Sequence, residues 1–183
     1  QPFVDEPYQY SDGTPIKNYD SQHKGFMSSR HAIMDSRNIP ALKAFQQVKN
    51  SNIKKFVTGL GLSPEIDSSG IIHEAHAIGG YTGESPVTMA GAYAAFANGG
   101  YYIKPHVVRK IKYRESDKVV ENNQTKKKVM SDSTAYMMTD ILIDTSKAAL
   151  GRYSDVNGLT YAAKTGTSNF SSETKKANGL SAD

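Results

Sequence analysis

The sequence is organised around one short stretch near its C-terminal end, Tyr161-Ala162-Ala163-Lys164-Thr165-Gly166-Thr167-Ser168. The stretch follows a turn at Asn157-Gly158, and its small and β-favouring residues predict a strand at the edge of a sheet. The lysine supplies positive charge, the glycine leaves room for a close backbone approach, and the hydroxyls can bind a carboxylate. Taken alone, the stretch is more simply explained as an edge strand whose lysine prevents aggregation, so the rest of the chain has to decide.

The composition is that of one folded domain. The chain has 183 residues, of which 38% are hydrophobic and 22% are charged, enough for a core. It contains no cysteine, which excludes disulfides, thiolate metal sites and thiol catalysis. The net charge of +4 comes from scattered lysine clusters without interleaved aromatic residues, so we expect no nucleic-acid partner. The apolar stretches are all too short to span a bilayer.

The spacing of apolar and turn-forming residues predicts helices that interleave with short strands. Helices are expected at 28–34, 40–48, 51–60, 86–98 and 131–142, and strands at 101–103, 106–114 and 118–121. Val107 and Val108 would lie inside the second strand, which pairs with the third as a hairpin. The segments 1–27, 62–84 and 146–158 are expected to be loops or extended chain, and 171–183 a polar tail without a closing element. The order of elements predicts an α/β fold, an antiparallel sheet flanked by helices.

Two short motifs occur once each. Ser36-Arg37-Asn38 fits the pattern Ser-x-Asn and lies between the first two predicted helices, where Pro40 restarts the chain in a helical first turn. Such a junction projects short polar side chains into a cleft more readily than the middle of a helix does. Lys164-Thr165-Gly166 fits the pattern Lys-Thr-Gly. In this order, the pair matches two of the three elements used by β-lactamases and penicillin-binding proteins.

The third element, Ser-x-x-Lys, carries the nucleophile, and it has three matches: Ser21-Gln22-His23-Lys24, Ser51-Asn52-Ile53-Lys54 and Ser172-Glu173-Thr174-Lys175. The nucleophile needs a buried helix start, where desolvation keeps part of the lysine neutral. The first match lies in a polar loop, the second follows Ser-x-Asn instead of preceding it, and the third lies in the polar tail. We therefore expect Ser51 to be a helix cap and none of the three serines to be the nucleophile.

A metal site is not expected either. His73-Glu74-Ala75-His76 is one residue shorter than the metalloprotease signature, so its histidines would not lie one helical turn apart at positions i and i+4. The other histidines have no carboxylate or serine partner at a telling spacing. The sequence thus predicts neither a metal nor another cofactor.

Longer stretches match as well. Ala77-Ile78-Gly79-Gly80, Ser85-Pro86-Val87-Thr88-Met89-Ala90 and the run from Ala92 to Gly100 resemble a hallmark of class A high-molecular-weight penicillin-binding proteins. The sequences around Ser36 and Lys164 are similar to the same class, and so is Ala135-Tyr136-Met137-Met138. The resemblance covers essentially the whole chain.

The resemblance implies a serine D,D-transpeptidase of a bifunctional cell-wall synthase, acting at the extracytoplasmic face of a bacterial membrane. Its partners would be peptidoglycan stem peptides ending in D-Ala-D-Ala and the β-lactam antibiotics that mimic them. The nucleophilic serine of such an enzyme expels the terminal D-Ala, and an amine from a neighbouring stem peptide resolves the acyl-enzyme.

The resemblance also implies roles for single residues. Ser36 would relay a proton, Asn38 would hydrogen-bond the amide of the acyl donor, and Lys164 would hold Ser36 and add positive charge. The backbone N–H of Thr167 would donate to the oxyanion. Substrate binding would fall to Thr165, Gly166, Thr167 and Ser168, with the hydroxyls facing the substrate carboxylate and Gly166 leaving room for its backbone.

One departure from the family pattern bears on catalysis. We expect residues 1–183 to be part of one transpeptidase domain that lacks its N-terminal Ser-x-x-Lys segment and its C-terminal strands. The nucleophile would then belong to the remainder of the parent chain, and the fragment alone would be inactive and poorly stable. Two alternatives stay open: a D,D-carboxypeptidase or β-lactamase-like hydrolase on the same fold, and a non-catalytic module for wall binding or sensing.

Overall fold

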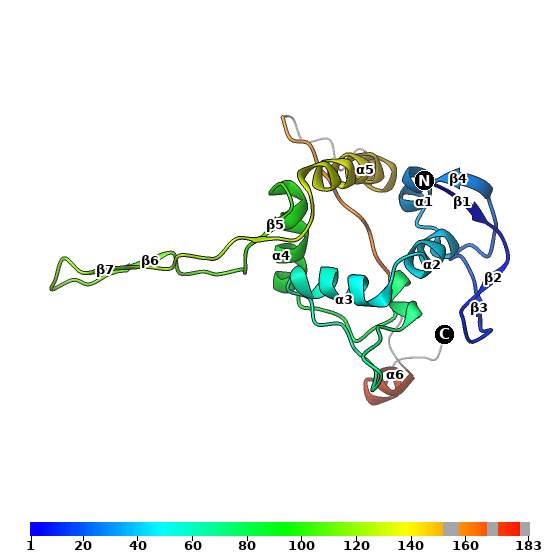
Figure 1. The fold of residues 1–183 in the computed structure, drawn as a ribbon, viewed down its shortest axis with the longest axis horizontal. Helices are drawn as coiled ribbons and strands as arrows, with labels where there is room; N and C mark the ends of the chain where they lie inside the picture. Colours follow the sequence, from blue (N-terminus) through cyan, green and yellow to red (C-terminus); the bar gives the residue numbers. More distant parts are fainter. Residues whose placement is uncertain (152–157, 168–171, 180–183) are drawn as a thin grey trace.

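The computed structural model describes residues 1–151, 158–167 and 172–179, and Figure 1 shows a helical body with one projecting hairpin. The helices are α1 (Ser29–Met34), α2 (Asn38–Gln46), α3 (Asn50–Gly59), α4 (Pro86–Ala97), α5 (Asp132–Leu150), α6 (Ser172–Ala177) and the short 3₁₀ helix η1 (Glu74–Ile78). The strands are β1 (Pro2–Asp5), β2 (Tyr8–Gln9), β3 (Pro15–Ile16), β4 (Gly25–Ser28), β5 (Tyr101–Tyr102), β6 (Lys110–Lys112), β7 (Val119–Glu121) and β8 (Lys127–Lys128). Among these helices, none has both the length and the apolar character needed to cross a bilayer.

Every strand pair in the described residues is antiparallel. The pairs are β1 with β4, β2 with β3, β5 with β8, and β6 with β7. This mixture of helices and antiparallel strands confirms the predicted fold class. The antiparallel pairing is divided over four two-stranded units, which the sequence pattern did not show.

The predicted hairpin is confirmed as β6 and β7, which project from the body (Figure 1). The placement of Val107 and Val108 inside its first strand was wrong. Val107 is 98% exposed, and the Val108 carbonyl accepts a bond from the side-chain amide of Asn122 instead of a ladder bond. All six residues of β6 and β7 are exposed, so the hairpin stands clear of the core.

Three predicted helix starts are confirmed by their caps. The side-chain oxygens of Ser28, Ser85 and Ser131 accept hydrogen bonds from the backbone N–H groups of His31, Thr88 and Thr134. Each cap satisfies one of the N–H groups that a helix start leaves unpaired. Pro86 follows Ser85 at the first helical position, where its missing N–H costs nothing.

The prediction that Ser51 caps a helix was wrong. Helix α3 begins at Asn50, with Lys49 in the cap position. The side chain of Asn50 is bound to the backbone of Ile72 through both its amide nitrogen (2.7 Å) and its oxygen (3.0 Å). The cap position is therefore Lys49, two residues earlier than expected, and Ser51 is exposed inside the helix.

Other parts of the prediction also differ from the structure: α2 spans Asn38–Gln46, where a helix at 40–48 was expected. Helix α5 continues to Leu150, through part of the segment expected to be a loop. The hydroxyl of Thr145 bonds back to the Ile141 carbonyl at 2.9 Å, so a polar residue that favours a helix end is accommodated inside the helix. The polar tail contains the short helix α6, which was not expected.

Within the described residues, the core consists of two clusters. One joins α4 to α5 and contains Leu60, Ala92, Ala95, Met130 and Ala135. The other lies under α2 and contains Ile16, Ile39 and Leu42. The many Ala and Gly residues of α4 favour a buried helix, but only one face of it is buried, because Val87 and Tyr93 are 64% and 41% exposed. Its small residues do permit close packing: a Cβ at Gly91 would lie 2.6 Å from the Pro105 ring.

The stretch expected to be the lysine strand has no strand in residues 158–167. A strand requires a neighbouring strand that exchanges backbone hydrogen bonds with it. In the described residues, the neighbour of this segment is the helix α5. The backbone N–H of Ala163 donates to the Leu142 carbonyl of α5 at 3.1 Å. In Figure 1 this orange segment leaves the side of α5 and passes through the body.

Candidate functional site

The junction between α1 and α2 holds Ser36 in an unusual backbone conformation. Its φ is +51°, in the left-handed region that L-residues other than glycine seldom adopt. The Ser36 N–H donates to the Ile33 carbonyl at 3.1 Å, and the Arg37 N–H donates to the Ala32 carbonyl at 2.9 Å. These two bonds form a Schellman motif, in which the left-handed position is usually glycine. The serine of Ser-x-Asn is therefore the residue that ends α1.

Lys164 lies against this serine. Its Nζ donates a hydrogen bond to the Ser36 hydroxyl, and a second one to the Thr165 carbonyl at 2.8 Å. Burial lowers the pKa of the Lys164 ammonium below its ordinary value, because desolvation disfavours the charged form. The structure thus joins the two predicted motifs through one lysine–serine contact.

Helix packing explains how two distant motifs meet. Arg30 on α1 forms ion pairs with Asp140 and Asp144 on α5, which fixes the two helices side by side. The Leu142 carbonyl lies between those aspartates in sequence and receives the Ala163 N–H. Ala163, the residue before Lys164, is therefore bonded to α5, and α5 is bonded to α1. Because Ser36 ends α1, Lys164 lies close to Ser36.

Asn38 starts α2 on the other side of the junction. Its side-chain amide nitrogen donates to the Lys17 carbonyl at 2.9 Å, which fixes the plane of the amide. Its backbone N–H and that of Ile39 donate to the side-chain oxygen of Asn18 at 2.9 Å and 3.4 Å. Arg37 occupies the cap position without a side-chain cap bond, so Asn18 supplies the cap of α2 from a separate segment.

The middle residue of the motif, Arg37, is buried. Its Nε donates to the carboxylate of Asp5 at 2.8 Å, and one terminal nitrogen donates to Asp20 at 2.7 Å. The other terminal nitrogen donates to the Gln22 carbonyl. The side chains of Arg37 and Asp5 are both fully inaccessible to solvent. Burial alone would raise the pKa of Asp5, but hydrogen bonds from Asn18, the Lys24 N–H and Arg37 lower it below its ordinary value.

The remaining predicted site residues lie beyond Lys164. Thr165, Gly166 and Thr167 are exposed, and the Thr165 carbonyl is used by Lys164. A Cβ added at Gly166 would meet no atom within 4 Å, and its backbone is not left-handed. Ser168, also predicted to bind substrate, lies outside the described residues.

Two of the three serines with a lysine three positions later are in unsuitable surroundings. Ser21 is exposed, and Lys24 pairs with Asp35 at 2.9 Å. That hydrogen bond raises the pKa of Lys24, whereas a general base needs a neutral amine. Ser51 is exposed on α3, where nothing desolvates it. The side chain of Ser172 lies outside what the structure describes.

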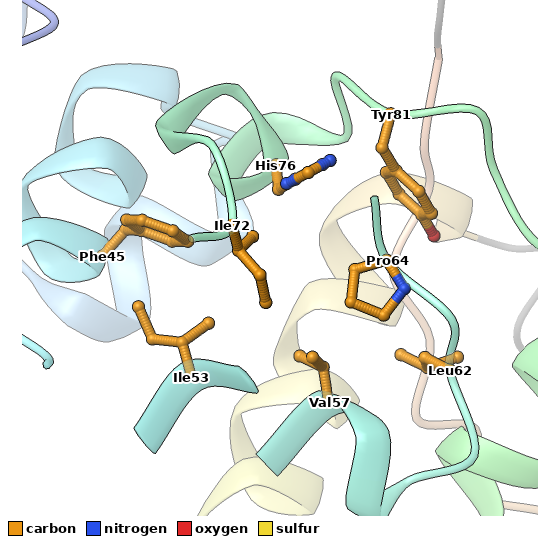
Figure 2. A pocket seen from close by; sticks show the side chains of 8 residues that line it. All are labelled: Phe45, Ile53, Val57, Leu62, Pro64, Ile72, His76 and Tyr81. Carbon is orange, nitrogen blue, oxygen red and sulfur yellow. The ribbon is translucent and has the colours of Figure 1, made fainter. Parts of the chain in front are cut away.

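An apolar pocket of about 210 Å³ lies elsewhere, at the opposite end of α2 from Asn38 (Figure 2). Its lining residues are Phe45, Ile53, Val57, Leu62, Pro64, Ile72, His76 and Tyr81, none of which was predicted for the site. The nitrogens of His76 are buried without a hydrogen-bond partner, and Glu65 is 3.8 Å from one of them. In the part of the chain that the structure describes, no group of acidic, histidine or cysteine side chains is arranged to hold a metal.

The site has a definite chemical capacity. A lysine whose burial favours the neutral amine, in contact with a hydroxyl, can pass a proton between that hydroxyl and a third group. The exposed residues after Lys164 leave open surface beside it. The sequence reasoning did not find Asp5, Asn18 or the burial of Arg37. The charge of Asp5 in an otherwise apolar strand, Pro2–Asp5, was the one available signal, because a charge in such a place needs a partner.

Comparison with protein families gives one match over nearly the whole chain. The model described as penicillin binding protein transpeptidase domain matches residues 1–182. Among curated proteins, the chain is 44% identical to penicillin-binding protein 1A/1B of Bacillus subtilis, over 95% of this chain and 19% of that protein. It is 39% identical to penicillin-binding protein 1A of Streptococcus pneumoniae, over 92% of this chain and 24% of that protein. The chain thus spans about a fifth to a quarter of these relatives.

Solved structures show the same fold. Penicillin-binding protein A from M. tuberculosis, as a ceftriaxone acyl-enzyme complex, matches with a TM-score of 0.76 and 16% identity, over 94% of this chain and 43% of that one. The PonA1 protein from M. tuberculosis, in complex with penicillin V, matches with a TM-score of 0.72 and 22% identity, over 92% of this chain and 47% of that one.

Proposed function

The chain belongs to the penicillin-binding protein transpeptidase domain family, and from this premise we propose that its gene product is a peptidoglycan D,D-transpeptidase of a bifunctional cell-wall synthase. The observation that carries the proposal is the hydrogen bond from Lys164 to Ser36, which joins the two family motifs of this chain. Its donor substrates are stem peptides ending in D-Ala-D-Ala, and β-lactams acylate it in their place. Peptidoglycan lies outside the membrane, so the domain acts at the extracytoplasmic face.

The reaction is acyl transfer through a serine ester. The serine hydroxyl loses its proton as its oxygen bonds to the carbonyl carbon of the penultimate D-Ala, the C–N bond to the terminal D-Ala breaks, and the leaving nitrogen takes a proton. An amine of a second stem peptide then attacks the ester, loses a proton, and releases the serine. Ser36 carries the proton to the leaving amine and back, in contact with Lys164. In this reaction a positioned proton donor is typically worth about 10²–10⁴-fold in rate.

The other site residues bind and orient the substrate. The Asn38 side chain hydrogen-bonds the amide of the acyl donor, while its bond to the Lys17 carbonyl at 2.9 Å holds the side chain in place. The hydroxyls of Thr165, Thr167 and Ser168 bind the substrate carboxylate, and the N–H of Thr167 donates to the oxyanion. Gly166 leaves space for the substrate backbone, and the open surroundings of its Cα support this.

The nucleophile is not one of the serines of this chain. Lys24 is paired with Asp35, and Ser51 is exposed and follows the Ser-x-Asn motif in the chain, so neither serine has the buried helix start that a nucleophile needs. The nucleophile belongs to the remainder of the parent chain, and residues 1–183 supply the second and third motifs of one transpeptidase domain. The fragment alone is inactive.

The test uses the full gene product and a fluorescent penicillin. We expect a covalent adduct that survives denaturation, on a peptide outside residues 1–183 when located by mass spectrometry. A labelled serine inside the chain would contradict the assignment of the nucleophile. Absence of any adduct would contradict the proposed function.

A second measurement separates cross-linking from hydrolysis. The full gene product is incubated with a pentapeptide ending in D-Ala-D-Ala and with glycine methyl ester as the acceptor amine. Release of D-Ala together with the amide product supports a transpeptidase. Release of D-Ala with only the shortened acid would assign a carboxypeptidase instead, and no release would favour the non-catalytic module.

A further inference from the structure

The middle position of Ser-x-Asn, which the motif leaves free, is occupied by the most enclosed charge of the site. The Arg37 side chain has no solvent exposure, and its partner Asp5 has none either. Placing both charges out of water is unfavourable unless geometry and further hydrogen bonds compensate. Here further hydrogen bonds compensate: Asp20 and the Gln22 carbonyl accept hydrogen bonds from the two terminal nitrogens of the guanidinium. Such an arrangement points to a need for a fixed geometry at this position.

The neighbouring residue Ser36 has that need. Its left-handed backbone, with φ of +51°, is intrinsically unfavourable for a residue with a Cβ and persists only where the surroundings impose it. Arg37 follows immediately and is held at both backbone and side chain: its N–H bonds to Ala32 at 2.9 Å, and its guanidinium is fixed by Asp5 at 2.8 Å. Fixing Arg37 restricts the ψ of Ser36 and hence the direction of its Cα–Cβ bond, and the hydrogen bond from Lys164 then holds the hydroxyl.

Asn18 connects the same cluster to Asn38. Its side-chain nitrogen donates to Asp5 at 2.7 Å and to the Gln22 carbonyl at 2.8 Å. Its side-chain oxygen is thereby turned toward the start of α2, where it accepts the Asn38 N–H at 2.9 Å. Asn18 is 3% exposed, and the bonds named here use both hydrogens of its amide and its oxygen. One buried cluster therefore sets the backbone on both sides of the junction.

We propose that Asp5, Asn18 and Arg37 are positioning residues, which hold the Ser36 hydroxyl and the Asn38 side chain in the orientation that acylation requires. They act through the backbone of the junction and touch no substrate. The proposal rests on the proposed transpeptidase function, since it assigns these residues to the same site. It predicts that loosening the cluster slows the chemistry in molecules that are still folded.

The test follows acylation of the full gene product by a fluorescent penicillin, with two separate readouts. The rate constant at saturating penicillin reports the chemistry, and the amplitude reports the fraction of competent molecules. For Arg37→Met and Asn18→Ala we expect the rate constant to fall about 10²-fold, the loss that a misplacement near 1 Å can cause. Arg37→Lys keeps the charge but lacks the guanidinium fork, so it should recover only part of the loss.

Two further variants show whether the effect comes from the Arg37–Asp5 cluster itself. Asp20→Ala removes one hydrogen-bond acceptor of the Arg37 guanidinium, a carboxylate that is 27% exposed. It leaves the Arg37–Asp5 pair complete and should slow acylation less than Arg37→Met does. Lys43→Gln is the matched control, because it removes an ion pair of 2.7 Å between α2 and Glu6, next to Asp5, without touching the junction. Its rate constant should stay near the wild-type value. A reduced amplitude with an unchanged rate constant in the cluster variants would overturn the proposal.

A readout independent of activity separates this inference from the proposed function. Amide hydrogen exchange of the peptide that covers Asn38 and Ile39 should become faster in Asn18→Ala and stay unchanged in Lys43→Gln. If the wild-type protein takes no penicillin, the proposed function fails, and the exchange result still supports or overturns the positioning by Asn18. If the wild-type protein reacts and all variants react equally fast, the positioning inference alone fails.

Discussion

The Nζ of Lys164 donates a hydrogen bond to the Ser36 hydroxyl across a sequence separation of 128 residues. Neither residue belongs to a regular element at the point of contact: Ser36 ends α1 in a left-handed turn, and Lys164 lies in a segment without regular structure beside α5. The contact is held from both sides, by the Schellman motif around Ser36 and by the bond from Ala163 to the Leu142 carbonyl at 3.1 Å.

Lys164→Met in the full gene product should lower the rate of acylation by a fluorescent penicillin by about 10²-fold or more, because it removes the group that exchanges a proton with Ser36 in the proposed mechanism. The matched control is Lys147→Met, at an exposed position near the end of α5, which should react normally. A Lys164→Met protein that reacts within about twofold of wild type would show that proton exchange through Lys164 is not used.

The pKa of Lys164 has a direct chemical consequence. Burial lowers it, so at a given pH a larger fraction of this amine is neutral than in an unstructured lysine. Only the neutral amine reacts with acetic anhydride. Trace labelling across a pH series should therefore give a half-maximal pH for Lys164 below that of a lysine in a reference peptide. An equal or higher half-maximal pH would contradict the direction of the shift.

Linkage gives the sign of the corresponding effect on stability. Because the pKa of Lys164 is lower in the folded state, the unfolded chain holds more protons in the interval between the two pKa values. The free energy of unfolding should thus rise with pH over that interval, relative to Lys164→Met. Pulse proteolysis in urea, followed through peptides of this chain, measures this difference. A difference that shrinks with rising pH would have the wrong sign.

Replacing Ser36 separates stability from chemistry. Glycine suits the left-handed position, whereas alanine keeps the Cβ that disfavours it, so Ser36→Gly should be more stable than Ser36→Ala by about 1 kcal/mol. Both variants lose the hydroxyl that contacts Lys164, and both should be slow in acylation. Pulse proteolysis and penicillin labelling of the two proteins test this together. Equal stabilities would show that the left-handed turn is not retained in solution.

Gly166→Ala tests the proposed substrate role of this glycine. An added Cβ would meet no atom within 4 Å, so stability should not change. If the substrate backbone lies against this residue, the methyl group should reduce acylation by roughly tenfold or more. Leu159→Ala, at an exposed position of the same segment, serves as the control. Unchanged acylation in Gly166→Ala would remove this residue from the proposed binding surface.

The sequence pattern was sufficient for the parts of the fold that depend on local signals. The caps at Ser28, Ser85 and Ser131 follow from side-chain chemistry within three residues, and the hairpin follows from a polar turn between two runs that contain β-favouring residues. The junction at Ser36 was predicted because Pro40 and the polar run before it interrupt the helical pattern.

The remaining features depend on partners that are distant in sequence. Asn18 caps α2 from 20 positions away, and Asp5 pairs with Arg37 from 32 positions away, so no local pattern indicates either. The left-handed turn was missed because serine, unlike glycine, gives no signal for it. Lys164 was assigned to a strand from composition alone, whereas a strand is defined by its neighbour.

The projecting hairpin has a consequence for chain length. The pairing of Tyr101 with Lys128 and of Tyr102 with Lys127 closes the loop that contains β6 and β7, so the body meets this loop only at its base. The entropy of closing a loop grows with the logarithm of its length, by about 0.6 kcal/mol for each doubling. Residues could therefore be inserted at the turn between Tyr113 and Lys118 at little thermodynamic cost. The tip of this arm is a place where a reporter peptide can be carried without disturbing the contact between Ser36 and Lys164.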